Sequence, residues 1–157
     1  MTDIMKDIAV LGKFSIELFD KNNKLKKHTI VHNRVVNTGL NMIAEWFGHN
    51  PNEIQHLTLF AIGTDGTDVT GKETKLLAQV ASAPLVNDPV RDHTSVLFEG
   101  KFGPSVPSTR QLIRECGLIN GVGGNLFNRC VFAPINKGPD DTLIIRYTIT
   151  VVTNTEE

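Results

Sequence analysis

Two cysteines are the first residues of this chain that could do chemistry. Cys116 and Cys130 flank a turn-forming stretch, residues 120–125, with the sequence Asn-Gly-Val-Gly-Gly-Asn. A hairpin centred near Gly123 would place the two cysteines directly opposite each other on neighbouring strands, where a cross-strand disulfide could form if the protein leaves the cell. The other interpretation is a pair of reduced thiols packed as small core residues, and cytosolic assembly favours it.

Charged residues near the same hairpin indicate ion pairing. Arg114 and Glu115 are neighbours in a predicted strand, so alternation would send their side chains to opposite faces. One of them then points toward the interior or an interface, where a carboxylate needs a basic partner or joins subunits. We expect that partner to be Arg129 or Arg146, on adjacent strands. A catalytic carboxylate at Glu115 is the alternative.

Other candidate ligands are poorly spaced. His28 and His32 are four residues apart, which on a strand separates them by ~13 Å, too far to share a metal ion. Asp65 and Asp68 could offer oxygens to calcium, but their loop lacks the acid pattern of an EF-hand, and a solvated turn is the better interpretation. The glycines of 121–124 are not followed by the residues of a phosphate-binding loop. We predict no metal and no cofactor.

Alternation of apolar and polar residues predicts the elements that must position these side chains. The first two strands should form a hairpin around the turn cluster 20–24, because Asn and Asp tolerate turn conformations. Pro84 and Pro89 restrict the ambiguous segment 80–90 to edge or irregular structure. The predicted strands cover residues 13–20, 25–35, 54–63, 93–102, 111–118, 126–132 and 143–152.

One helix is predicted after the second strand. Its apolar stripe, spaced at i, i+3, i+4 and i+7, consists of Leu40, Ile43, Ala44 and Phe47. Asn37 or Thr38 can supply the N-cap oxygen, and Gly48 can end the helix. Trp46 lies off the stripe, so it should pack against the sheet or face a neighbouring subunit. A further helical turn is expected near 73–77.

Many short strands and one helix predict a mainly β protein: an antiparallel β-sandwich, jelly-roll-like, with one short α-helix. Because no composition break or repeat divides the 157 residues, we expect a single domain over 1–157, with residues 1–10 as a flexible N-terminal arm.

Composition disfavours several classes of function. A formal net charge of −1 provides no field for a phosphate backbone, so we expect no nucleic-acid partner. The basic run 24–28 is interpreted as a solvated strand end. No apolar run reaches the ~18 residues of a membrane helix, and no signal pattern precedes residue 8, which predicts synthesis and folding in a cytosol. Asp92-His93 is the only adjacent acid–base couple, and we predict that the protein is not an enzyme.

Several short sequence segments, in their order along the chain, resemble those of a family of small virion structural proteins of tailed bacteriophages, described as decoration or tail-fibre-like. The resemblance covers roughly residues 13–152. Its pieces are Phe14-Ser15-Ile16-Glu17-Leu18-Phe19-Asp20-Lys21 with Leu25-Lys26, Val35-Val36-Asn37-Thr38-Gly39-Leu40-Asn41, Ile62-Gly63-Thr64-Asp65-Gly66-Thr67, Ile113-Arg114-Glu115-Cys116-Gly117-Leu118, and Phe132-Ala133-Pro134-Ile135-Asn136-Lys137 followed by Asp141 and 143–149.

The resemblance implies membership of a virion and carries over no catalytic residue. The expected function is a homo-oligomeric capsid decoration or accessory protein, with a trimer favoured, that binds itself and other virion proteins such as major capsid or tail proteins. Its expected location is the virion, after synthesis in the host cytoplasm. A tail, neck or baseplate adaptor or fibre component is the first alternative. A glycan-binding β-sandwich module is more remote, because it would need clustered exposed aromatic side chains.

Overall fold

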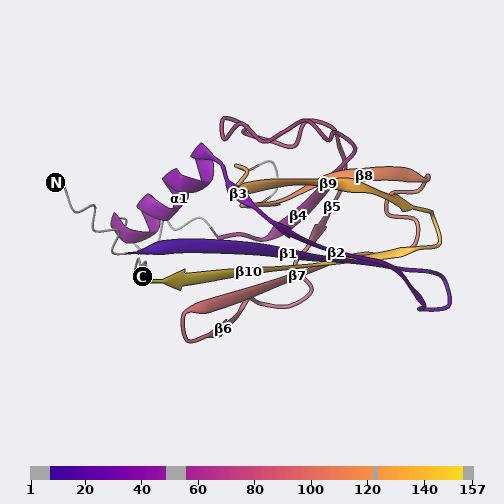
Figure 1. Ribbon diagram of the computed structural model, residues 1–157, viewed down its shortest axis with the longest axis horizontal. Helices are drawn as coiled ribbons and strands as arrows, with labels where there is room; N and C mark the ends of the chain where they lie inside the picture. Colours follow the sequence, from indigo (N-terminus) through magenta and orange to yellow (C-terminus); the bar gives the residue numbers. More distant parts are fainter. Residues whose placement is uncertain (1–7, 49–55, 122–123, 154–157) are drawn as a thin grey trace.

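The computed structural model describes residues 8–48, 56–121 and 124–153. In these residues the chain forms ten strands and one helix (Figure 1). Their bounds are β1 Ala9–Phe19, β2 Leu25–His32, β3 Arg34–Val35, α1 Asn37–Gly48, β4 Leu59–Gly63, β5 Gln79–Pro84, β6 Val90–Asp92, β7 Ser95–Phe102, β8 Gln111–Ile119, β9 Asn128–Lys137 and β10 Thr142–Val152.

The strands form two antiparallel sheets that lie one above the other (Figure 1). The first sheet has the order β2-β1-β10-β7-β6, and the second sheet has the order β3-β9-β8-β4-β5. With α1 at one end, this is the predicted antiparallel β-sandwich with one short helix. The three C-terminal strands are also present, but only β8 and β9 pair with each other, and β10 crosses to the first sheet between β1 and β7.

On each side of the sandwich, a segment of the chain passes from one sheet to the other. The predicted strand 25–35 is in fact two strands, because the chain leaves β2 at His32 and enters the second sheet at Arg34. On the other side, β5 ends at Pro84, and Leu85 then bridges to Gly100 of β7. Such corners let one hydrophobic core be enclosed by two sheets.

The core lies between the sheets, and its residues follow the alternation seen in the sequence. Phe14, Ile16 and Leu18 of β1 are buried opposite Tyr147, Ile145 and Leu143 of β10. Gly100 permits a close approach of the two sheets, because a Cβ there would overlap the Phe60 ring. The predicted turn 20–24 is also present: the Asp20 carboxylate accepts the amides of Asn22 and Lys24.

The helix is present, but its predicted stripe is wrong by one position. Gly39 and Met42 are the buried residues of α1, whereas Leu40 and Phe47 are exposed. Gly39 faces the second sheet because a larger residue would collide with the Phe127 carbonyl. Trp46 packs against the sheet, which was one of the two positions expected for it. Its ring is stacked on Phe127 at a centroid distance of 5.8 Å.

Several predicted boundaries change. The Thr38 hydroxyl donates to the Leu126 carbonyl, so this residue also ties the start of α1 to the chain before β9. The segment 73–77 contains no helical turn, and the strand predicted from residue 54 begins at Leu59. β1 begins at Ala9, so it includes the last two residues of the predicted arm 1–10; residues 1–7 lie outside the described part of the chain. The predicted turn centre at Gly123 also lies outside it.

Candidate functional site

The outer face of the second sheet is covered by the connection between β4 and β5, residues 64–78, called here the 64–78 loop (Figure 1). A second small hydrophobic cluster lies on this side of the sheet. Its buried members are Val36, Ala61, Leu76, Ile119 and Leu126. The loop is thus packed onto the sheet and does not extend freely into solvent.

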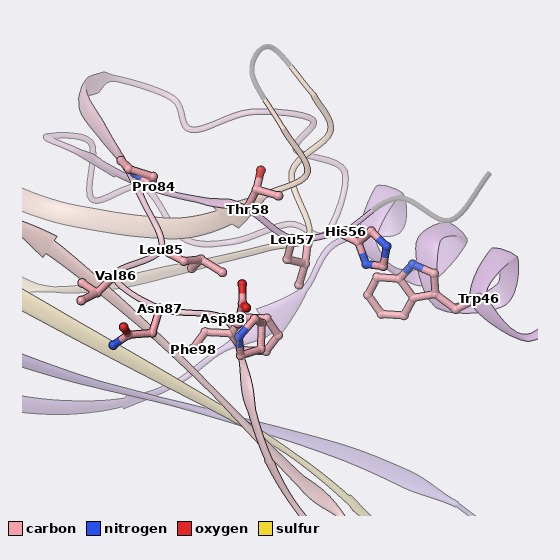
Figure 2. Close-up of a pocket in the computed structure, with 11 residues that line it drawn as sticks. Trp46, His56, Leu57, Thr58, Pro84, Leu85, Val86, Asn87, Asp88 and Phe98 are labelled. Atoms are coloured by element: carbon pink, nitrogen blue, oxygen red, sulfur yellow. The ribbon is translucent and has the colours of Figure 1, made fainter. Parts of the chain in front are cut away.

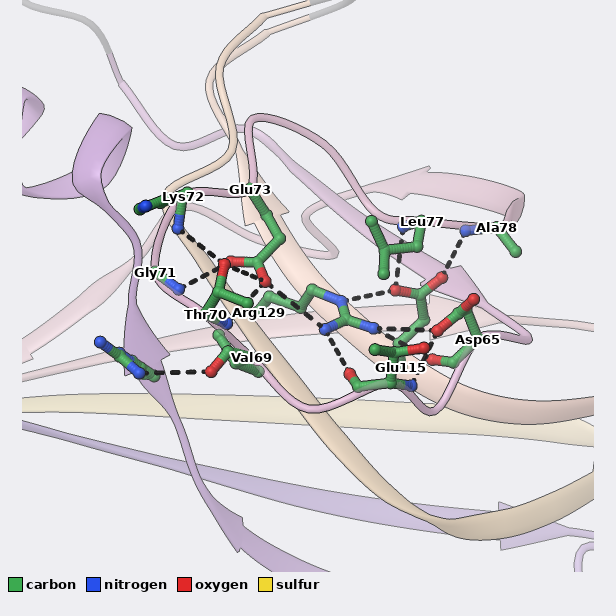
Figure 3. A network of polar contacts seen from close by, with 12 residues as sticks. Asp65, Val69, Thr70, Gly71, Lys72, Glu73, Leu77, Ala78, Glu115 and Arg129 are labelled. Atoms are coloured by element: carbon green, nitrogen blue, oxygen red, sulfur yellow. Dashed lines mark hydrogen bonds and ion pairs between the residues drawn. The ribbon is translucent and has the colours of Figure 1, made fainter.

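Beside this cluster lies a buried ion pair, formed by Glu115 of β8 and Arg129 of β9 (Figure 3). Both side chains are 0% exposed, and the Arg129 Nε atom lies 2.7 Å from Glu115 Oε2. The other Glu115 bonds come from the loop: the amides of Leu77 and Ala78 donate to its two oxygens at 3.1 and 2.7 Å. Arg129 and the two loop amides together hydrogen-bond both oxygens of the Glu115 carboxylate.

The Arg129 guanidinium holds the beginning of the same loop. It donates to the carbonyl oxygens of Thr67, at 2.7 Å, and Asp65, at 3.2 Å (Figure 3). The carboxylates of Asp65 and Glu73 lie 3.6 and 4.0 Å from its nitrogens. These contacts fix the 64–78 loop to β8 and β9, and we call the arrangement the latch; the Asp65 side chain at its edge is 34% exposed.

Glu73 forms hydrogen bonds within the 64–78 loop. Its carboxylate accepts the amides of Thr70 and Gly71 and the Thr70 hydroxyl, at 2.7 to 2.9 Å. Burial alone would raise the pKa of the Glu73 carboxyl, but these hydrogen bonds outweigh burial and hold the pKa below its usual value. The carboxylate is therefore stabilised in its charged form.

The predicted partners of Glu115 are half correct. Arg129 is its partner, but Arg146 lies on the other sheet, where it pairs with Glu17 and with Glu99, the latter at 2.7 Å. The alternation argument for Arg114 and Glu115 also fails, because the β8–β9 register shifts between Ile113 and Glu115. A bulge of this kind breaks the period of two, and Arg114 lies beside Gly66 of the same loop.

Cys116 and Cys130 are direct cross-strand partners, as the hairpin predicted. Their Sγ atoms are 3.1 Å apart, and both thiols are free and buried in the main core. Burial, with the neighbouring Cys130 thiol and the Glu115 charge, raises the pKa of the Cys116 thiol well above its ordinary value. A buried thiol with a raised pKa is a poor nucleophile, so the pair behaves as two core residues.

The outer face of the first sheet is different, and we call it the open face. No described segment of the chain lies over it, and apolar side chains are exposed on it: Leu11 (57%), Ile30 (55%) and Val90 (59%). Between them, Arg146 bridges Glu17 and Glu99 at the surface, with about 38% of its own side chain exposed. The residues on this face come from all five strands of the first sheet.

A hollow of about 640 Å³ opens at the end of the sandwich next to α1 (Figure 2). Trp46 and His56 lie along one side, and the segment 84–89 that changes sheet lies along the other. Leu57 and Phe98 are buried beneath it. We call this feature the hollow. No sequence pattern predicted it, although Asn87-Asp88 between two prolines marks a short polar loop.

The remaining candidate ligands do not come together. His28 and His32 lie on the edge strand β2, opposite Glu17 and Lys13, and His28 contacts the Ser15 hydroxyl at 3.0 Å. Asp65 is engaged by Arg129, whereas Asp68 is exposed. Within the described residues, no group of three or more His, Cys, Asp or Glu side chains is placed to hold a metal ion.

The basic run 24–28 is partly used in the fold. The Lys26 amine lies 3.3 Å from the Asp141 carboxylate, and Lys27 donates to the Pro134 carbonyl. Nearby, the buried Lys137 amine donates to the carbonyls of Gly103 and Asp141, and burial lowers its pKa. These contacts tie together loops at the end of the sandwich away from the helix.

No protein-family model, curated protein or solved structure matches the chain at a significant level. In the residues that the structure describes, no helix has the length and apolar character of a membrane span.

Proposed function

We propose that this protein is a structural component of a tailed-phage virion and acts through the open face. The proposal combines the resemblance in sequence with one observation, the contrast between a covered and an uncovered sheet. Apolar side chains that are more than half exposed, interleaved with polar and charge-paired ones, are typical of surfaces that bind other proteins.

The strand edges are less suited to such contacts. β2, the long edge strand, carries Lys26 and Lys27, while β3 and β6 have two and three residues. β5 ends in Pro84, which cannot donate a ladder hydrogen bond. Lysines, short strands and prolines are the devices that keep edges from pairing with other chains. The face of the sheet is therefore the preferred contact, rather than its edges.

Within the virion, we favour a homotrimeric capsid decoration protein, with a tail, neck or baseplate component as the alternative. A single small domain that repeats one contact surface around a symmetry axis is sufficient for this role. The partners would be further copies of the chain and other virion subunits.

The test is fractionation of the lysate from a host infected with the phage whose genome encodes the chain. Banded particles are analysed by mass spectrometry, and the chain is located on them by immuno-electron microscopy. We expect the chain in the particle band, with label on the head. A chain that remains entirely in the soluble fraction would contradict virion membership, and label confined to the tail would replace the decoration role by the alternative.

A further inference from the structure

We propose that the hollow beside α1 binds a saccharide unit. This inference goes beyond the proposed virion role and does not depend on it. It is based on which side chains the fold gathers around the hollow, from four segments that are far apart in the sequence: α1, residues 56–58, residues 84–89 and β7. Its volume of about 640 Å³ falls within the ~300–1,000 Å³ typical of small-molecule sites.

The first requirement for a sugar is an aromatic platform that is rigid and accessible. Trp46 is half-buried, and stacking on Phe127 at an interplanar angle of 26° fixes the orientation of its ring. The Trp46 indole borders the hollow next to His56 (Figure 2). Indole is a large apolar surface that loses little conformational entropy on binding, and the C–H face of a sugar ring packs on such surfaces.

The second requirement is a set of polar groups for the hydroxyls. Asn87 and Asp88 lie across the hollow from Trp46 and His56, and both are exposed (Figure 2). In the described part of the chain, their side chains make no hydrogen bond or ion pair. A carboxylate accepts hydrogen bonds from two neighbouring hydroxyls, and an amide both donates and accepts, which suits a polyol.

Other classes of ligand fit less well. A purely apolar molecule would cover Asn87 and Asp88 without satisfying them, at a desolvation penalty. A phosphate or another anion would meet the Asp88 carboxylate. A cationic side chain of a neighbouring protein could use both the indole and Asp88, so it must be separated from a sugar by experiment.

The chain contains one tryptophan, so its fluorescence reports on the hollow directly. The purified full chain is titrated with glucose, galactose, mannose, rhamnose and N-acetylglucosamine, up to about 100 mM, where a Kd of about 10 mM is nearly saturating. We expect at least one sugar to change Trp46 emission with a saturable curve. Saturation-transfer NMR with the same sugar should show that its protons contact the protein.

Two variants locate the binding. Asp88→Asn should weaken the apparent affinity for that sugar at least tenfold, and Asn87→Ala should weaken it severalfold. Asp92→Asn is the matched control: Asp92 is an exposed carboxylate on β6, 87% accessible, away from the hollow, and this change should leave the titration unaltered. Thermal midpoints within about 1 °C of the parent would show that the variants are folded.

Three outcomes would overturn the proposal: no saturable change with any of the sugars, a change that Asp88→Asn leaves intact, or a change that N-acetyl-lysine methyl ester alone produces. The last result would assign the hollow to a basic side chain of a protein partner. None of these outcomes affects the particle-fractionation test, so the two proposals can fail separately.

Discussion

Each outer face of the sandwich carries an arginine that pairs with carboxylates, but one arginine is buried and the other is partly exposed. On the second sheet, Arg129 is fully buried and pairs with Glu115 beneath the 64–78 loop. On the first sheet, Arg146 bridges Glu17 and Glu99 in contact with solvent. The chain thus places an arginine–carboxylate network in two settings: one fixes a loop beneath solvent, and the other lies at the surface of an uncovered sheet.

Burial decides how much each arginine contributes to stability. A surface pair gains little because water already solvates both ions, whereas removal of one partner of a buried pair leaves an uncompensated charge in a medium of low dielectric. Matched substitutions on the two faces should therefore differ in their effect on the free energy of unfolding.

The largest effect should come from Arg129→Met. It leaves Glu115 buried with only two amide donors, and we expect a loss of about 3–5 kcal/mol in the free energy of unfolding, measured by urea denaturation. Arg146→Met is the matched control on the open face and should lose at most about 1 kcal/mol. Equal losses would remove the distinction between the two faces.

A double variant separates the pair from the packing around it. Glu115→Gln combined with Arg129→Met removes both charges and keeps one acceptor for the loop amides. We expect the double variant to be more stable than Arg129→Met alone, because no buried charge remains unpaired. If the double variant is the less stable of the two, the residual Glu115 charge is not what destabilises the single variant.

A smaller loss is expected from Gly63→Ala, at the junction of β4 and the 64–78 loop. A Cβ at this position would lie 2.6 Å from the Ala78 carbonyl oxygen and would also meet the Glu115 carboxylate. The backbone must shift to accommodate it, at a cost of about 1–3 kcal/mol. Gly103→Ala is the control, since a Cβ there meets nothing within 4 Å, and it should be nearly neutral. Thermal melts of the two variants decide the comparison.

Glu73 gives the loop an acid-sensitive contribution of about 1 kcal/mol. Because its folded pKa lies below the ordinary 4.5, its stabilisation is present above pH 4.5 and is lost as the pH falls through the folded pKa. Glu73→Gln should therefore flatten the fall in stability between about pH 5 and pH 3. Asp68→Asn, an exposed acid of the same loop, should leave that slope unchanged; a flattening by Asp68→Asn instead would show that Glu73 is not the acid-sensitive group.

The sequence was sufficient to predict the parts of the fold that have a regular period. β1 and β10 alternate without interruption, so both could be predicted as strands; which face of β10 is buried, the one with Tyr147, is settled by its packing. The cross-strand cysteines followed from the symmetry of their spacing around a glycine-rich turn. In β8 the period of two mispredicts the faces of Arg114 and Glu115, because a bulge before Glu115 shifts the register. The bulge could not be predicted, since no residue type marks one uniquely.

The rest depends on contacts between distant segments. In α1, two overlapping stripes are apolar, and the one containing Gly39 is buried because only glycine fits against the Phe127 carbonyl. The 64–78 loop has no period, so nothing local indicates that it covers a sheet. The hollow combines residues 46, 56–58, 84–89 and 98, which no single motif connects. Charged residues within apolar strands, Glu115 in 111–118 and Arg129 in 126–132, were the signals for the latch.

The smallest effect on stability should come from substituting an exposed apolar residue of the open face. The same substitution should have the largest effect on assembly. Ile30→Ser removes an apolar side chain that is 55% exposed, and we expect a change within about 0.5 kcal/mol in the free energy of unfolding. If this face forms the contact between copies, the same substitution should convert the oligomer, which we expect to be a trimer, to monomers in light scattering. Val106→Ser, an exposed valine in the loop between β7 and β8, is the control and should leave the mass unchanged.

An unchanged mass for Ile30→Ser and for Leu11→Ser would show that the oligomer uses another surface. A parent chain that is already monomeric would instead confine the contact to the assembled particle, and binding of the Ile30→Ser chain to particles lacking the protein would then be the deciding measurement.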